Sequence, residues 1–208
     1  MKTLILWSVG IFVILSAGLA GAEPLFTQNK FTTAESLDSG MTQAGIHFTL
    51  GDHYKSYYPE VRYGLGAMLE VGVKFGAAVA TIDSSESLGA LIGADLKYQV
   101  IKEADGVPLD MAVDLGLDNT ILHNKNASEL TFSTIFSRGF PLADRGYKFT
   151  PYVGLELAAL RGSLPADSST SLYLFGGLEW KLSQKFMLIL EVKGGPSTVG
   201  GAGIRFEY

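Results

Sequence analysis

Hydrophobic and polar residues alternate with a period of two along almost the whole chain after Gly40. The clearest stretch is LEVGVKFGAAVAT, residues 69–81, and residues 109–118 and 171–182 show the same pattern. A period of two is typical of β-strands whose two faces meet different surroundings, whereas a helix would show a period of 3.6. The alternation therefore predicts an all-β protein.

Turn-forming residues divide this pattern into ten predicted strands, and the outer loops expected between them include residues 82–88 and 121–128. Residues 23–40 fit neither period, and we expect them to form an N-terminal leader with a short turn of helix at residues 34–37. The predicted strands are residues 41–50, 57–65, 69–81, 89–101, 108–120, 129–138, 148–160, 171–183, 186–195 and 198–208.

The length of these strands favours a membrane protein. Several have about 10–13 residues, whereas strands of globular proteins commonly have about 5–6 and tilted membrane strands about 9–11. We therefore predict a closed antiparallel transmembrane β-barrel of about ten strands over residues 41–208, with eight or twelve strands as alternatives. A soluble exported β-sandwich remains an alternative, because alternation alone does not exclude it.

The two faces of the predicted strands differ in charge. A charge on a lipid-facing side chain costs about 2–4 kcal/mol near the membrane midplane, so we expect the nearly uncharged face to contact lipid. The charged face would line a narrow lumen, where opposite charges should pair because an unpaired buried charge is unfavourable. An aqueous path and a binding site are the alternatives for this lining. The predicted lumen charges are Glu70, Lys74, Asp114, Glu156, Glu179, Lys181, Glu191, Lys193 and Arg205.

The first residues have the composition of a secretory signal peptide. Lys2 precedes an apolar run from Leu4 to Leu15, and small residues up to Ala22 form a cleavage pattern, so residues 1–22 are the predicted signal. The run is shorter than the roughly 20 residues that a membrane-spanning helix needs. The chain has no cysteine, which excludes a lipoprotein anchor, and its net charge of −5 argues against nucleic acid as a partner.

The chain ends in GIRFEY, with Gly203, Phe206 and Tyr208 at positions that resemble the C-terminal assembly signal of Gram-negative outer-membrane β-barrel proteins. Gly201 departs from that signal, because a polar residue is usual there. The resemblance implies that the barrel-assembly machinery recognises the chain during insertion and that outer-membrane lipid surrounds it. It also implies that both ends of the barrel domain face the periplasm.

Few residues suggest catalysis. His47 faces the predicted lumen, whereas Asp52, His53 and His123 fall in predicted outer loops, where an Asp–His pair could activate water. No cofactor or metal motif is present in the sequence, and we expect neither. We also expect Tyr54, Tyr57 and Tyr58 to contribute to an aromatic girdle at the outer rim. A second group would lie at the inner rim: Phe140, Tyr147, Phe149, Trp180, Phe186, Phe206 and Tyr208.

These observations predict a small integral outer-membrane barrel that is not an enzyme. Its expected role is structural, or the porin-like passage of small solutes through a narrow charged lumen. An adhesion or binding barrel that uses its outer loops, and a hydrolase at the outer rim, are the alternatives.

Overall fold

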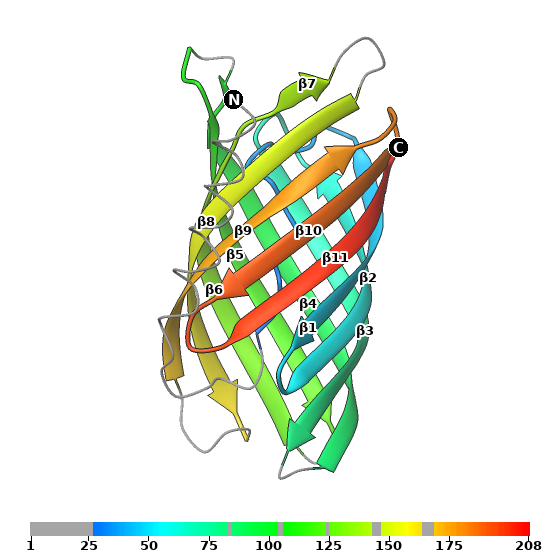
Figure 1. Ribbon diagram of the computed structural model, residues 1–208, viewed down its shortest axis with the longest axis vertical. Helices are drawn as coiled ribbons and strands as arrows, with labels where there is room; N and C mark the ends of the chain where they lie inside the picture. Colours follow the sequence, from blue (N-terminus) through cyan, green and yellow to red (C-terminus); the bar gives the residue numbers. More distant parts are fainter. Residues whose placement is uncertain (1–26, 83–84, 104–105, 124, 143–146, 164–168) are drawn as a thin grey trace.

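The computed structural model describes residues 27–82, 85–103, 106–123, 125–142, 147–163 and 169–208 (Figure 1). Within these ranges no helix is long and apolar enough to cross a membrane. The described chain forms eleven strands: β1 (Thr42–Gly51), β2 (Tyr54–Gly64), β3 (Leu69–Ile82), β4 (Ser85–Ile101), β5 (Asp110–Leu122), β6 (Lys125–Ser137), β7 (Phe140–Leu142), β8 (Tyr147–Gly162), β9 (Ser169–Lys181), β10 (Phe186–Gly194) and β11 (Thr198–Glu207).

The strands form one closed antiparallel barrel, as the sequence predicted. Consecutive strands pair with each other, except that β6 pairs with β8 and not with β7. The barrel closes where β1 pairs with β11, from Gln43–Glu207 to Gly51–Val199. Closure satisfies the backbone N–H and C=O groups of the edge strands, which could not otherwise find partners inside lipid. We call the end that carries Thr42 and Tyr208 the C-terminal end; it lies at the top of Figure 1.

Strands β6 and β7 occupy a single position in the wall, so the barrel has ten strand positions. Both pair with β8, and their shared line is interrupted at Arg138 and Gly139. Pro151 of β8 lies opposite this interruption and has no N–H to donate, so only its carbonyl takes part, accepting from the Arg138 N–H at 3.3 Å.

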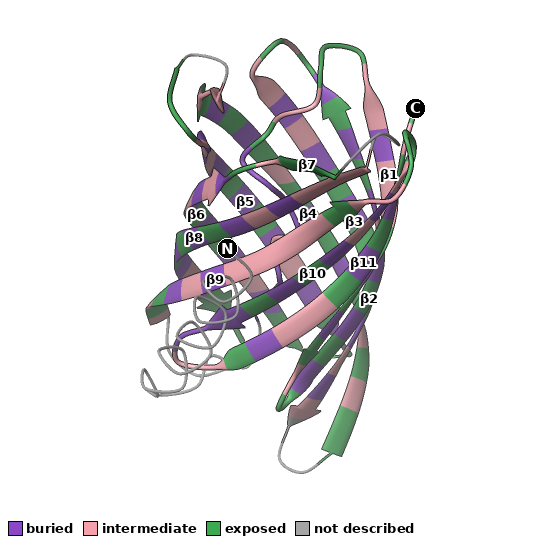
Figure 2. Ribbon diagram, turned by 45° about the horizontal axis from the view of Figure 1, so that its top comes forward, coloured by how far each residue is buried: buried purple, intermediate pink, exposed green. Residues whose placement is uncertain are grey.

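The predicted alternation of faces is confirmed. On β3, Val73 and Phe75 are 52% and 63% exposed, whereas Lys74 between them is 9% exposed. Figure 2 shows the same banding of exposed and buried residues along the other strands. The exposed side chains are predominantly apolar, so the outer surface of the barrel suits contact with lipid.

Three local predictions are wrong. The expected loops at 82–88 and 121–128 are largely strand, because Ile82 pairs with Ser85 and Leu122 with Lys125 across short hairpins. The expected helical turn at 34–37 is absent, since the backbone there bonds to wall side chains instead. Tyr54 and Tyr58 do not join a girdle, because they point into the lumen on the same face of β2 as the buried Glu60, whereas Tyr57 points outward.

The described part of the expected leader lies inside the barrel. Figure 1 shows it as the blue trace within the ring of strands. Gln28 contacts Ser56 near the end opposite the C-terminal end, whereas Leu37 contacts Glu70 at the start of β3. The chain then reverses at Ser39 and Gly40 to enter β1. We call residues 27–38 the plug.

Candidate functional site: a plugged lumen

The barrel wall supplies hydrogen-bond partners for the backbone of the plug. An extended segment inside a barrel cannot use a strand ladder, so its N–H and C=O groups need side-chain partners. Lys97 binds two backbone carbonyls of the plug, because its Nζ donates to Thr33 O at 3.1 Å and to Glu35 O at 2.9 Å. The N–H donors of the plug bond as follows: Lys30 to Glu191 Oε1 (2.7 Å), Phe31 to Glu191 Oε2 (2.8 Å), Ala34 to Ser137 Oγ (3.1 Å), Ser36 to Gln99 Oε1 (3.0 Å) and Leu37 to Glu70 Oε2 (2.9 Å).

Phe31 is the apolar anchor of the plug. Its ring is fully buried and stacks on His47, with ring centroids 4.8 Å apart. Gly201 of β11 makes room for it, because a Cβ at that position would meet the Phe31 ring. A ring burial of this kind favours the plugged state through the hydrophobic effect.

Lys30 is the one cation in the sequence of the plug, and it pairs with the wall. Its Nζ lies 2.6 Å from Asp114 Oδ1, 2.7 Å from Thr131 Oγ1 and 3.7 Å from Glu156 Oε2. Glu156 also pairs with Lys193 at 2.8 Å, whereas Asp114 has no second cation among the ion pairs of the described residues. Asp114 therefore depends on Lys30 for charge compensation.

A second network surrounds Arg62. Its guanidinium pairs with Glu60 at 2.8 Å and also with Glu70 and Asp95, and Lys97 lies 3.2 Å from Glu70. Arg62 is 2% exposed. A guanidinium with five fixed donors can bridge several carboxylates, which a lysine could not do with the same geometry.

The structure brings the predicted lumen charges together in separate clusters. Asp114, Glu156, Glu191 and Lys193 gather around the plug near Lys30, and Glu70 belongs to the Arg62 network. Lys74 is apart from both, pairing with Asp118 at 2.9 Å. The remaining three lie toward the C-terminal end: Arg205 pairs with Glu179 at 3.4 Å, and Lys181 pairs with Glu207 at 3.1 Å.

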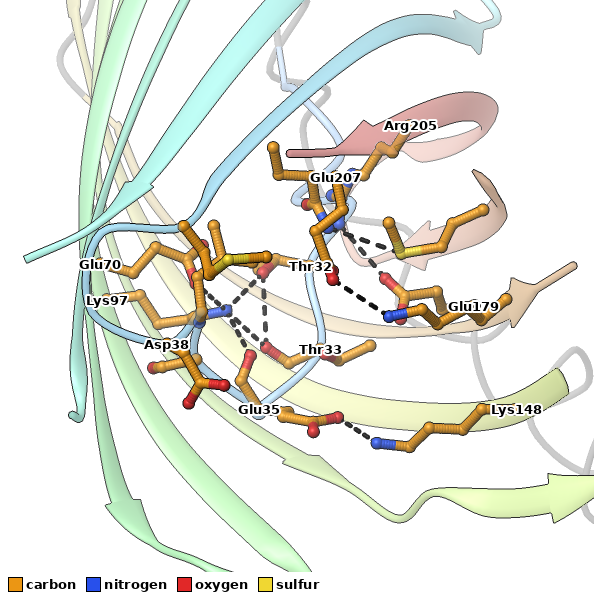
Figure 3. A pocket seen from close by; sticks show the side chains of 16 residues that line it. Thr32, Thr33, Glu35, Asp38, Glu70, Lys97, Lys148, Glu179, Arg205 and Glu207 are labelled. Atoms are coloured by element: carbon orange, nitrogen blue, oxygen red, sulfur yellow. Dashed lines mark hydrogen bonds and ion pairs between the residues drawn. The ribbon is translucent and has the colours of Figure 1, made fainter. Parts of the chain in front are cut away.

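A polar cavity of about 180 Å³ lies at the C-terminal end of the plug (Figure 3). Residues of the plug form one side of it, and wall residues that include Glu70, Lys97, Glu179 and Arg205 form the other. Cations and carboxylates alternate around this cavity and are mostly paired with one another, as with Lys148 and Glu35. The cavity is a vestibule that ends at the plug.

The wall carries more buried negative than positive side chains. Among the described strand residues, eight carboxylates are buried against five cations. The carboxylates are Glu60, Glu70, Asp110, Asp114, Asp118, Glu129, Glu156 and Glu191, and the cations are Arg62, Lys74, Lys97, Lys193 and Arg205.

The histidines do not converge on one site. His47 is buried in the lumen, with its Nε2 3.1 Å from Glu60 Oε2. Asp52, His53 and His123 are exposed at the end opposite the C-terminal end. Among the residues that the structure describes, no group of three potential ligands could hold a metal ion.

The plug is the feature that the sequence did not reveal. Its residues lack alternation, so nothing in the pattern places them inside the barrel. One signal was available: the NKFTTAES stretch, residues 29–36, places a single lysine and a phenylalanine among small polar residues, a composition that suits a charged narrow space.

No protein-family model matches the chain, and no curated protein matches it. Solved structures do resemble it. The N-terminal β-barrel domain of Pseudomonas aeruginosa OprF is 12% identical, with 83% of this chain and 100% of that chain covered and a TM-score of 0.39. An outer-membrane channel from Pseudomonas putida is 10% identical, with 88% and 100% covered and a TM-score of 0.46.

The KdgM porin, solved in complex with disordered oligogalacturonate, is 12% identical, with 79% of this chain and 98% of that chain covered and a TM-score of 0.40. Similarity at this level concerns the architecture alone. The strand pairing and the apolar outer surface establish that architecture directly. The chain is a closed antiparallel β-barrel of ten strand positions with an apolar outer surface and a charged lumen.

Proposed function

We propose that this protein is a closed outer-membrane barrel whose narrow charged lumen passes small solutes only when the plug leaves it. The observation that carries the proposal is the position of Lys30, which crosses from the plug to Asp114 of β5 and Glu156 of β8. A structural role without passage is the competing function, and it predicts that the lumen stays closed without the plug.

The plug obstructs most of the path along the lumen. It contacts Ser56 near one end of the barrel and Glu70 near the other, and Phe31 and Ala34 between these contacts are fully buried. A solute that entered from the vestibule would meet plug backbone bonded to Lys97 and Glu191. The plugged state is therefore expected to be closed.

The wall does not depend on the plug for its own backbone pairing. Every wall strand except the short β7 pairs with two neighbouring wall strands, so withdrawal of the plug would leave the strand ladder intact. The plug is joined to β1 only through residues 39–41, a short connection that includes the reversal at Gly40. Displacement of the plug would therefore break the contacts between plug and wall and leave the strand pairing of the barrel in place.

Planar-bilayer recording tests this function. The unaltered protein is expected to give little steady conductance, and a variant that lacks residues 27–38 is expected to give stepwise channel currents. Heat-modifiable gel mobility of both proteins serves as the control for a folded barrel. Large steady currents from the unaltered protein would reject closure by the plug, and a folded but silent deletion variant would support the structural role instead.

A further inference from the structure

The Lys30 ammonium occupies a pocket that the barrel wall builds. Its ligands come from three adjacent positions in the wall: Asp114 of β5, Thr131 of β6 and Glu156 of β8. All three are at most 2% exposed. Asp114 Oδ2 is buried and has no hydrogen-bond partner in the part of the chain that the structure describes, so the pocket retains unused capacity to accept a hydrogen bond.

Gly116 gives this pocket its size. A Cβ at Gly116 would lie 2.9 Å from Lys30 Nζ and 2.6 Å from Thr131 Oγ1, so both groups would have to shift away from their present positions. The wall therefore leaves room for a compact –NH₃⁺ head group at this point. A quaternary ammonium group, with methyl groups in place of its hydrogens, would meet the same wall and could not donate hydrogen bonds.

The charge around the pocket selects a cation. Glu156 is compensated by Lys193, but among the described residues Lys30 is the one cation paired with Asp114, so the pocket without Lys30 would hold an uncompensated carboxylate. An anion is disfavoured by both carboxylates. A primary ammonium group has three N–H donors, one for each of Asp114, Thr131 and Glu156. The described residues offer no cluster suited to a metal ion.

We propose that this pocket is a primary-ammonium site and that Lys30 is its internal occupant. Solutes that carry a primary amine compete with Lys30 for the site, and this competition favours the displaced plug. The inference rests on the proposed function for its transport consequence, and it names small organic cations with a primary amine as the solute class. The binding site itself is tested without any measurement of transport.

Chemical rescue tests the site. Lys30→Ala removes the occupant, and the barrel is expected to unfold at a lower temperature when followed by gel mobility. Propylammonium chloride should then raise the unfolding temperature by several degrees, because a ligand that binds only the folded state stabilises it. Tetramethylammonium chloride and potassium chloride at equal ionic strength should give no comparable rise. If Lys30→Ala does not fold alone, the yield of folded barrel with and without propylammonium becomes the measurement.

Two matched variants make the result specific. In Lys30→Ala/Asp114→Asn and in Lys30→Ala/Gly116→Ala, propylammonium should not stabilise beyond the salt controls. Rescue of equal size in these variants, or none in Lys30→Ala, would overturn the ammonium site. Either result leaves the bilayer test of the plug unaffected. If propylammonium stabilises Lys30→Ala but the variant without residues 27–38 gives no channel current, the transport function is rejected and the ammonium site is retained.

Discussion

At the residue scale, every buried cation of the wall in the described ranges lies within ion-pair distance of a carboxylate. These cations are Arg62, Lys74, Lys97, Lys193 and Arg205. Such pairs need not add stability relative to apolar side chains, but loss of one partner leaves a buried charge without compensation. Single and paired substitutions should therefore have different effects.

Lys74 offers the simplest test, because its ammonium pairs with Asp118 at 2.9 Å and also lies over the Tyr58 ring. We expect Lys74→Ala to lower the free energy of unfolding by about 3 kcal/mol and Lys74→Ala/Asp118→Asn to recover part of that loss. Urea unfolding in detergent measures both. Lys55→Ala is the control, since the Lys55–Glu86 pair is 55% and 67% exposed and should contribute less than about 1 kcal/mol. A loss in Lys74→Ala no larger than in the control would contradict the expectation.

At the scale of elements, Tyr208 extends the pairing between β11 and β1 by one residue beyond the end of β11. The Thr42 N–H donates to Tyr208 O at 3.1 Å, and the Tyr208 N–H donates to Thr42 O at 2.8 Å. The Tyr208 ring is 65% exposed, with Lys185 Nζ 5.9 Å from its centroid. An aromatic ring at this height suits the interface between lipid and water.

The resemblance of GIRFEY to an assembly signal leads to a prediction about insertion. Tyr208→Phe keeps the ring and should insert almost normally, because water can replace the hydroxyl contacts. Tyr208→Asp places a charge at the interface, and deletion of Tyr208 removes both bonds to Thr42, so both should slow insertion and leave strand edges open to proteolysis. Pulse-labelled cells analysed by gel mobility would show this, and normal insertion of both severe variants would make the terminal aromatic residue incidental.

At the scale of the whole molecule, the lumen is lined mainly by negative side chains, and the plug places one lysine, Lys30, among them. Buried wall carboxylates outnumber buried wall cations, and Lys30 supplies one further positive charge from inside. A narrow path lined by one dominant sign of charge concentrates ions of the opposite sign. The sign of the charge that lines the lumen should therefore decide which ions enter once the plug is gone.

The variant without residues 27–38 should consequently prefer cations. In a potassium chloride gradient, its reversal potential should have the sign expected of a channel that is more permeable to potassium than to chloride. Neutralising Asp114 and Glu191 as Asn and Gln in the same variant should reduce that potential, because both carboxylates face the space that the plug vacates. An anion preference would contradict the charge argument while leaving closure by the plug intact.

The sequence alone determined the strands and the direction of their side chains. Val73, Lys74 and Phe75 fall on alternate faces because the pleat has a period of two, a property of the backbone that needs no distant contact. The strand number followed from the spacing of turn residues. The loops at 82–88 and 121–128 were overestimated, because polar residues such as Glu86 and Asn126 also fit the exposed end of a long hairpin.

Only the tertiary structure decided what fills the lumen. Lys30 meets Asp114 across 84 positions of sequence, and the Lys30 N–H meets Glu191 across 161, so these contacts depend on the register of all ten wall positions at once. The plug carries no periodic pattern because its neighbours surround it on every side. Local periodicity therefore determined the wall of this barrel, whereas its interior was determined by closure, which brings distant side chains around a segment with no regular structure of its own.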